Sequence, residues 1–280
     1  MNSEPKSRYT FSGHETFQCK MLWLKKGYDF VRTNKNFNLP DAVIDLGVGK
    51  NMVSAIRYWL KAFGLFTNDN LTEIAHYIFD KDHNTEDLTT LWLLHYLLVN
   101  TNHASLYNLT FLEFQKERKE FSVEQLQKFI KRKCIDIGNS NENTVKKDIG
   151  VLLKNYVMPV EGMPFDDYST LLLEINLIRA KTEDKVYIFN DLGKRAVTPE
   201  ILLYAIIDQK GQDKTVSFDV LQKISLIFCM PMLELIETIQ YLEKIYKGTI
   251  VYTDNAGIKQ VQFLKELDKF EVLNHYYDRI

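Results

Sequence analysis

Apolar residues recur three and four positions apart along much of the chain, which is the spacing of helices that bury one face. In the first part of the chain this spacing predicts helices at 16–33, at 41–46 and from about 51 to 63. Gly47 and Gly49 stand between the second and third of these helices, where they can form the tight turn of a helix-turn-helix. The segment after Gly64 is expected to be a vestigial wing that passes into another helix.

The same order of helix, short helix, turn, longer helix and hairpin is expected twice more. In the middle of the chain it comprises a helix at 122–133 with a Ser122 and Gln125 capping box, a helix capped by Asn143–Thr144 that runs to Tyr156, and β-rich runs at 171–178 and 185–189. Near the end it comprises helices that begin at Pro199, Ser217 and Pro231, followed by a hairpin at 254–257. The apolar run 86–99 predicts a buried helix between these sets.

We therefore expect a mainly α (α+β) fold of tandem winged helix-turn-helix modules with small β-hairpin wings. The expected boundaries are an N-terminal helix-turn-helix module at 1–80, a central helical or winged-helix module at 81–192 with its hairpin at 171–189, and a C-terminal winged-helix module at 193–280.

Composition supports a folded protein in a reducing compartment. The chain has 280 residues, of which 45% are hydrophobic and 26% are charged, so it can bury a sizeable core. Its three cysteines have no paired spacing, and no signal sequence or membrane-spanning run is evident. We expect a cytoplasmic protein without membrane contact.

The net charge of −2 conceals an alternation of basic and acidic segments. Lys and Arg exceed Asp and Glu in residues 1–61 and 116–154, whereas acids exceed bases in 62–115 and 155–280. Ordinary compositional scatter explains such a pattern as well as function does. If it is functional, the two basic segments are landing sites for a polyanion.

The helix from about 51 to 63 has the polar face that a recognition helix requires. Its expected apolar side includes Ile56 and Trp59, and the opposite side carries cations and hydroxyls without an acid. Arg57 is suited to a guanine edge or a phosphate, and Lys50 and Lys61 to phosphates. The candidate DNA-binding residues of this first patch are Lys50, Asn51, Ser54, Arg57, Tyr58 and Lys61.

A second basic patch is expected on the central helices, and it suits contacts to the DNA backbone rather than to bases. Its candidate residues are Lys131, Arg132, Lys133, Lys146 and Lys147. The last long helix instead carries Glu234, Glu237 and Glu243, which repel phosphates. The C-terminal module is therefore expected to contact a protein partner or a second copy of the chain.

Catalytic motifs are weak. Gly47–Lys50 lacks the first glycine and the final hydroxyl of a phosphate-binding loop, and the histidines lack the spacing of a zinc site. His14 and Glu15 are adjacent residues of the types that act as a catalytic acid–base pair, but a hydrogen-bonded structural role is the commoner outcome for such a pair. We predict no catalytic residue, no metal and no cofactor.

Four stretches resemble a bacterial family catalogued as domain of unknown function 4007. They are Phe11–Phe17 (FSGHETF), Trp23–Tyr28, Asp41–Trp59 and Ala62–Leu65, and the resemblance is looser beyond them. Members of that family tend to be encoded beside enzymes resembling phosphoadenosine phosphosulfate reductases and cysteine desulfurases, in DNA phosphorothioation-type and phage-defence gene clusters. The resemblance implies a role near DNA modification, with such an enzyme as partner, and it supplies no established catalytic residues.

The leading hypothesis from the sequence is a non-catalytic, DNA-binding targeting or regulatory subunit of such a system, with duplex DNA as its ligand. The alternative is a protein–protein scaffold or adaptor whose winged-helix modules make no DNA contact. An enzyme that uses His14 and Glu15 is the third hypothesis.

Overall fold

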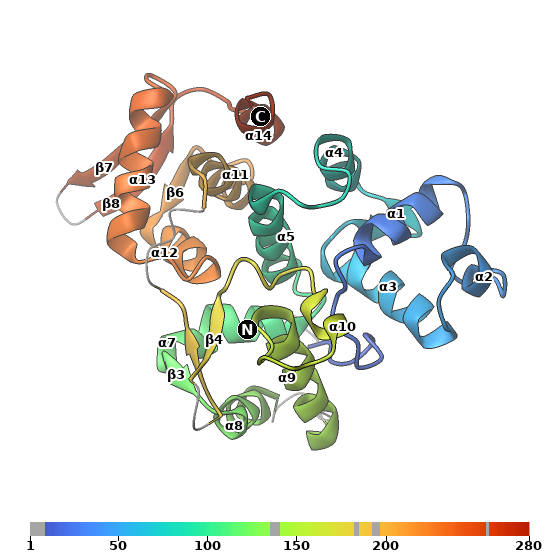
Figure 1. Ribbon diagram of the computed structural model, residues 1–280. Coiled ribbons are helices and arrows are strands. Elements are labelled where there is room, and N and C mark those ends of the chain that lie inside the picture. Colours follow the sequence, from blue (N-terminus) through green and yellow to red (C-terminus); the bar gives the residue numbers. More distant parts are fainter. Residues whose placement is uncertain (1–8, 135–140, 182–184, 192–196, 256–257, 280) are drawn as a thin grey trace, which may run out of the picture. The chain divides into compact units, whose positions relative to one another are not determined.

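The computed structural model describes residues 9–134, 141–181, 185–191, 197–255 and 258–279, and divides the chain into two compact units, Met1–Asn190 and Asp191–Ile280 (Figure 1). Both units combine helices with small antiparallel sheets. The expected helix-rich α+β class is confirmed. The finer description as tandem winged-helix modules, and the division into three modules, stay predictions.

The first unit begins with three helices that share a small core. These elements are α1 (Trp23–Arg32), α2 (Ala42–Leu46), α3 (Lys50–Ala62), the two-residue strands β1 (Phe66–Thr67) and β2 (Asn70–Leu71), and α4 (Glu73–Lys81). Phe30, Ala42, Leu46 and Val53 pack together between α1, α2 and α3. The sequence predicted that the first helix begins at residue 16, which is wrong, because Glu15 and Thr16 have positive φ values of 50° and 66°.

The rest of the first unit surrounds a buried helix, α5 (Leu88–Asn100), as expected for its apolar sequence. The other elements are α6 (Ser105–Leu109), a π-helix at Thr110–Phe114, α7 (Gln115–Glu117), β3 (Glu120–Phe121), α8 (Val123–Cys134), α9 (Glu142–Tyr156), α10 (Phe165–Tyr168), β4 (Ile178–Lys181) and β5 (Val186–Phe189). The strands pair in the order β3-β5-β4.

Local signals in this unit had mixed outcomes. The capping box is confirmed, since the Ser122 N–H donates to Gln125 Oε1 at 2.9 Å and the Gln125 N–H donates to Ser122 Oγ at 3.4 Å. The cap of α9 is Asn141, whose side chain accepts from the Asn143 N–H, and not Asn143–Thr144. The run at 171–178 becomes a strand only from Ile178, and residues 182–184 of its hairpin lie outside the described residues.

The second unit contains α11 (Pro199–Lys210), β6 (Thr215–Ser217), α12 (Phe218–Ile227), α13 (Met232–Ile245), β7 (Ile250–Asn255), β8 (Ile258–Phe263) and α14 (Lys269–Tyr277). Its strands pair in the order β6-β8-β7, and β7 and β8 form the predicted hairpin with Ile250 opposite Phe263. Two of the predicted turn residues, 256 and 257, lie outside the described part of the chain.

None of the described helices is long and apolar enough to cross a membrane. Cys19, Cys134 and Cys229 are buried, and none of them forms a disulfide.

Candidate nucleic-acid interface

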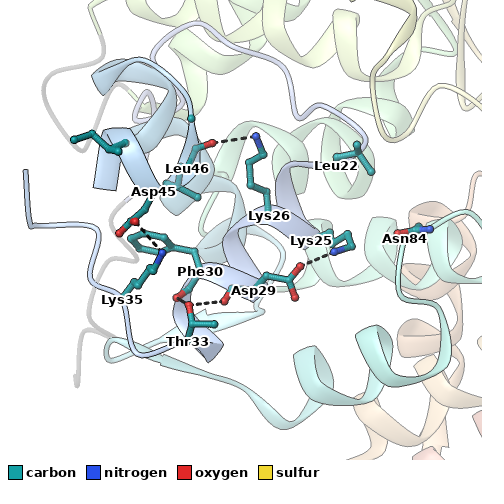
Figure 2. A pocket seen from close by; sticks show the side chains of 12 residues that line it. Leu22, Lys25, Lys26, Asp29, Phe30, Thr33, Lys35, Asp45, Leu46 and Asn84 are labelled. Carbon is teal, nitrogen blue, oxygen red and sulfur yellow. Dashed lines mark hydrogen bonds and ion pairs between the residues drawn. The ribbon is translucent and has the colours of Figure 1, made fainter. Parts of the chain in front are cut away.

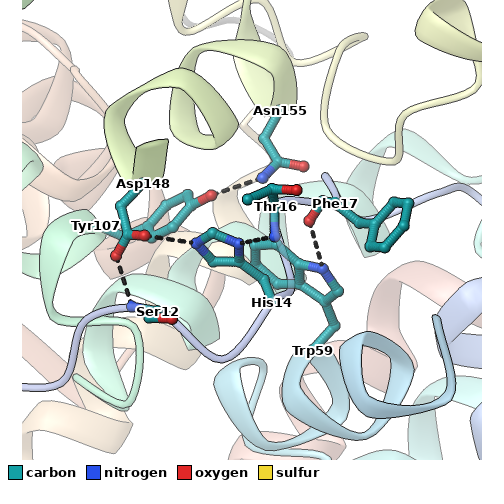
Figure 3. Close-up of polar contacts among 8 residues, drawn as sticks. All are labelled: Ser12, His14, Thr16, Phe17, Trp59, Tyr107, Asp148 and Asn155. Atoms are coloured by element: carbon teal, nitrogen blue, oxygen red, sulfur yellow. Dashed lines mark hydrogen bonds and ion pairs between the residues drawn. The ribbon is translucent and has the colours of Figure 1, made fainter. Parts of the chain in front are cut away.

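The FSGHETF motif forms a tight loop that a carboxylate of α9 holds in place (Figure 3). Asp148 Oδ2 accepts the Ser12 N–H at 2.7 Å, and Asp148 Oδ1 lies 3.1 Å from His14 Nε2. The backbone N–H of Thr16 donates to His14 Nδ1 at 3.1 Å, so Nδ1 is the acceptor and Nε2 carries the proton that Asp148 accepts. The motif thus uses its histidine to bind α9.

Aromatic rings of α3 enclose this histidine. His14 is stacked on Trp59 with ring centroids 5.9 Å apart, and its ring edge meets Tyr58 at 5.5 Å. Trp59 Nε1 donates to the Phe17 carbonyl at 3.2 Å. Because His14 is only 3% exposed and both ring nitrogens are engaged, its position is that of a structural residue. The enzyme hypothesis gains no support from this geometry.

A second attachment follows a few residues later. The Cys19 N–H donates to Asn155 Oδ1 at 3.0 Å, and Asn155 Nδ2 donates to the Tyr107 hydroxyl at 2.6 Å. Lys20 forms an isolated antiparallel bridge with Thr170. The sequence analysis missed Asp148 and Asn155, because a single acid or amide on a helix gives no local sign of a partner 136 positions away.

A hollow of about 360 Å³ lies beside the motif and is lined by polar and charged side chains. We call it the polar hollow; its lining residues are Ser12, His14, Glu15, Thr16, Asn51, Thr144, Lys147 and Asp148. Asn51 comes from the first predicted DNA-binding patch and Lys147 from the second. The fold therefore brings one residue of each patch, almost 100 positions apart in the sequence, to the same hollow.

The N-terminus of α3 is the most accessible part of the first patch. Lys50, Asn51 and Ser54 are exposed, and the N-cap, Gly49, offers no side chain to the free N–H groups of the first turn. Those N–H groups and the helix dipole favour an anion at this end of α3.

Arg57 and Lys61, farther along α3, are less available to a DNA phosphate than the sequence suggested. Arg57 donates to Asn38 Oδ1 at 2.7 Å and to Asp69 Oδ1 at 2.9 Å, and Lys61 Nζ lies 6.0 Å from the centre of the Phe66 ring. Both side chains are half-buried.

Tyr58 was expected on the exposed face, and this expectation is wrong. The residue is buried, with 9% of its surface exposed, and the motif loop covers it. Gly13 approaches so closely that a Cβ atom there would lie 2.6 Å from Tyr58 Cδ2. Burial, with Asp148 nearby, raises the pKa of the Tyr58 phenol well above its ordinary value. The spacing of apolar residues in α3 did not reveal that the motif loop buries a second face of this helix.

The three cations near the end of α8 are each matched by an acid. Lys131 pairs with Glu142, Arg132 with Glu117 at 2.7 Å, and Lys133 with Glu113. Lys146 and Lys147 are exposed on α9 and make no ion pair with a described residue. Within the second patch, Lys147 is therefore the cation best placed to meet a phosphate beside α3.

Another hollow, of about 570 Å³, lies between α1 and α2 and also contains three lysines (Figure 2). Lys25 pairs with Asp29 at 2.5 Å and Lys35 with Asp45 at 2.8 Å, whereas Lys26 donates to the Leu46 carbonyl at the end of α2 at 3.0 Å. The Lys25–Asp29 pair lies within α1, whereas the contacts of Lys26 and Lys35 join α1 and the segment after it to the α2 region, so the lysines are explained by the fold.

The comparisons with known proteins agree with this architecture. Two solved structures, described as "SspB crystal structure" and "Magnesium ion-bound SspB crystal structure", are 24% and 23% identical to this chain, and both have a TM-score of 0.83. Each likeness covers 96% of this chain and 88% of the other. No curated protein matches the chain.

The family can be assigned more firmly than the function. The model of the family described as "Protein of unknown function (DUF4007)" matches residues 11–277, nearly the whole chain. The chain belongs to this family, which confirms the resemblance found in the motifs of its first part.

Proposed function

We propose that this protein binds duplex DNA as a non-catalytic targeting or regulatory subunit of a DNA-modification system of the phosphorothioation type, or of a phage-defence system. Family membership and fold are consistent with the coarser role. The observation that carries the DNA contact is the polar hollow, where Asn51 of α3 and Lys147 of α9 line one surface.

The chemistry of this surface suits a phosphate backbone. Lys50 and Lys147 supply charge, and the first turn of α3 supplies free N–H groups. Ser54 and Asn51 are hydrogen-bonding side chains on the same exposed end of α3, and an Asn amide can also read an adenine edge.

Arg57 joins this surface when a DNA phosphate replaces its present carboxylate partner. Its carboxylate partner, Asp69, is 67% exposed, and ion pairs between solvated groups contribute about 0–1 kcal/mol. A phosphate can therefore replace Asp69 at small cost. A winged helix-turn-helix, with α3 as its recognition helix and β1–β2 as a short wing, is the arrangement that we propose for residues of the first patch.

The test is a titration of a fluorescent random-sequence duplex over a series of salt concentrations. The double variant Lys50→Glu/Lys147→Glu is compared with Lys223→Glu/Lys244→Glu, which makes the same change in net charge on exposed lysines of the second unit. Counterion release predicts that losing two phosphate contacts flattens the log–log salt dependence by about 1.8. Equal binding by both variants would refute the assigned surface.

The scaffold alternative rests on the ion pairs of α8, which leave Lys131, Arg132 and Lys133 with matched charge. It predicts that wild-type protein shows no salt-dependent DNA affinity at low salt. Substitution of Arg57 and Lys61 by Glu then weakens a protein complex instead.

One of the similar SspB structures is described as magnesium ion-bound, which raises the question of a metal site in this chain. The described residues of this chain hold no group of three or more His, Cys, Asp or Glu side chains that could bind a metal. In the polar hollow, both carboxylate oxygens of Asp148 already accept hydrogen bonds. The hollow is lined by two carboxylates, Glu15 and Asp148, which is fewer than three acidic or imidazole ligands free for an ion, and the proposed function uses no metal.

A further inference from the structure

A second face of α9 borders an apolar groove of about 460 Å³ within the first unit. We call it the methionine groove; its main lining residues are Lys146, Gly150, Lys154, Met158, Val160 and Met163. Lys147 and Thr144 of the same helix line the polar hollow, and the two hollows share no lining residue. One helix thus serves two separate surfaces.

The rim of the groove exposes large apolar side chains. Met158, Val160 and Met163 are 56%, 64% and 49% exposed, although residues of this kind are usually buried. Their segment is held in an ordered turn, since the Tyr168 hydroxyl donates to the Val160 carbonyl at 2.7 Å and the Met163 N–H donates to it at 3.2 Å. Methionine-rich surfaces adapt to the shape of a protein ligand.

Cations flank the apolar floor. Lys146 makes no ion pair with a described residue but lies within electrostatic range of Glu124, and Lys154 Nζ lies 3.8 Å from Asp167 Oδ1. The lining residues carry two lysines and one carboxylate, Asp167, which leaves a net charge of +1 among them. A ligand that covers the methionines is therefore expected to carry acidic groups at its edges.

Gly150 leaves the backbone of α9 bare at the groove. A Cβ atom at this position would meet nothing within 4 Å, so the glycine is not required by packing in this structure. Glycine inside a helix is less favourable than alanine. The open backbone lets another helix approach α9 closely.

From these features we propose that the methionine groove binds an amphipathic, acidic helix of a partner protein. The apolar face of that helix covers Met158, Val160 and Met163, and its carboxylates pair with Lys146 and Lys154. A fully solvated helix face would not explain three exposed large apolar residues in one groove, and a DNA strand would leave them uncovered. The proposal stands independently of DNA binding, because its residues do not line the polar hollow.

The experiment uses the full chain and a fluorescent synthetic helix of about 16 residues, with Leu at intervals of three and four and Glu at the flanking positions. A charge-inverted peptide with Lys in place of Glu, and a scrambled peptide that has no apolar stripe, are the matched controls. We expect saturable binding of the acidic peptide at least tenfold tighter than binding of either control.

Gly150 provides a matched pair of variants. Gly150→Trp fills the groove and is expected to reduce affinity for the acidic peptide at least tenfold, whereas Gly150→Ala retains it. Lys146→Glu/Lys154→Glu is expected to reverse the preference between the acidic and charge-inverted peptides. Circular dichroism checks that each variant remains folded, and the DNA titration of the two Gly150 variants is expected to be unchanged.

Three outcomes would overturn the proposal. They are no preference for the acidic peptide, equal binding to Gly150→Trp and Gly150→Ala, and concentration-dependent self-association that Gly150→Trp abolishes, which would assign the groove to a second copy of the chain. Failure here with intact salt-dependent DNA binding would leave the proposed function standing.

Discussion

Asp148 illustrates how one carboxylate fixes the chemistry of its neighbours. It is 5% exposed and accepts the Ser12 N–H and the His14 Nε2–H, while the Thr16 N–H prevents His14 from adopting the other neutral tautomer. A buried carboxylate with both oxygens satisfied is a stable arrangement, but each donor depends on it. Such a residue is more sensitive to substitution than an exposed acid on the same helix.

Replacement of Asp148 by Asn should therefore destabilise the fold despite the nearly equal size of the two side chains. The amide presents an NH₂ group to one of two donors, which leaves a buried N–H unsatisfied at a cost of about 1–3 kcal/mol. Urea denaturation measures the change. Glu142→Gln on the same helix is the control, and it removes only the solvated ion pair with Lys131. Ion pairs of this kind contribute about 0–1 kcal/mol, so the control should change stability by no more than that; equal effects would contradict the role of Asp148.

At the scale of elements, two helical glycines have opposite surroundings. A Cβ atom on Gly27 of α1 would lie 2.6 Å from Leu60 Cδ1 and 2.8 Å from Ile56 Cγ2. The two helices α1 and α3 therefore pack too closely here for a side chain at position 27. A Cβ atom on Gly150 of α9 would meet nothing within 4 Å. Intrinsic helix propensity is the same for both positions, and only the packing differs.

Alanine substitution should consequently change stability in opposite directions at these two positions. Gly27→Ala is expected to destabilise the protein by about 1–3 kcal/mol through overpacking, whereas Gly150→Ala is expected to stabilise it by about 0.5–1 kcal/mol. Chemical denaturation of the two variants and the wild type gives both values. A shift of the same sign in both variants would show that propensity, rather than contact with α3, decides the outcome.

Local patterns in the sequence predicted most helices and the β7–β8 hairpin, because spacing, caps and turn residues act over a few positions. They also predicted exposure of Lys50, Asn51 and Ser54. They failed where contacts between distant segments determine burial or secondary structure. Tyr58 is covered by the motif loop, and residue 16 lies in a loop that α9 holds. The polar hollow combines residues from distant segments, so no single segment could predict it.

At the scale of the whole molecule, the two compact units differ in how local their contacts are. The second unit has its own buried residues on helices and strands, among them Leu221, Leu235, Ile239, Leu242 and Val261. In the first unit, Ser12 and Cys19 are bound by side chains of α9. The loop before α1 is thus held by residues well beyond the predicted module boundary at 80.

Expression of separate fragments tests this dependence. A fragment of residues 191–280 should unfold cooperatively when followed by circular dichroism, because it contains a complete core. A fragment of residues 1–80 should lack a cooperative transition, since Asp148 and Asn155 are missing. Cooperative unfolding of the 1–80 fragment would instead support an autonomous N-terminal module.

The attachment of the motif loop to α9 also sets an order of events during synthesis. Ser12 and Asp148 are 136 positions apart, and so are Cys19 and Asn155. At translation rates of about 5–20 residues per second, the ribosome needs roughly 7 to 30 seconds to make the intervening chain. During that interval the motif loop lacks both of its attachments to α9, so the N-terminal segment completes its contacts only after α9 has emerged from the ribosome.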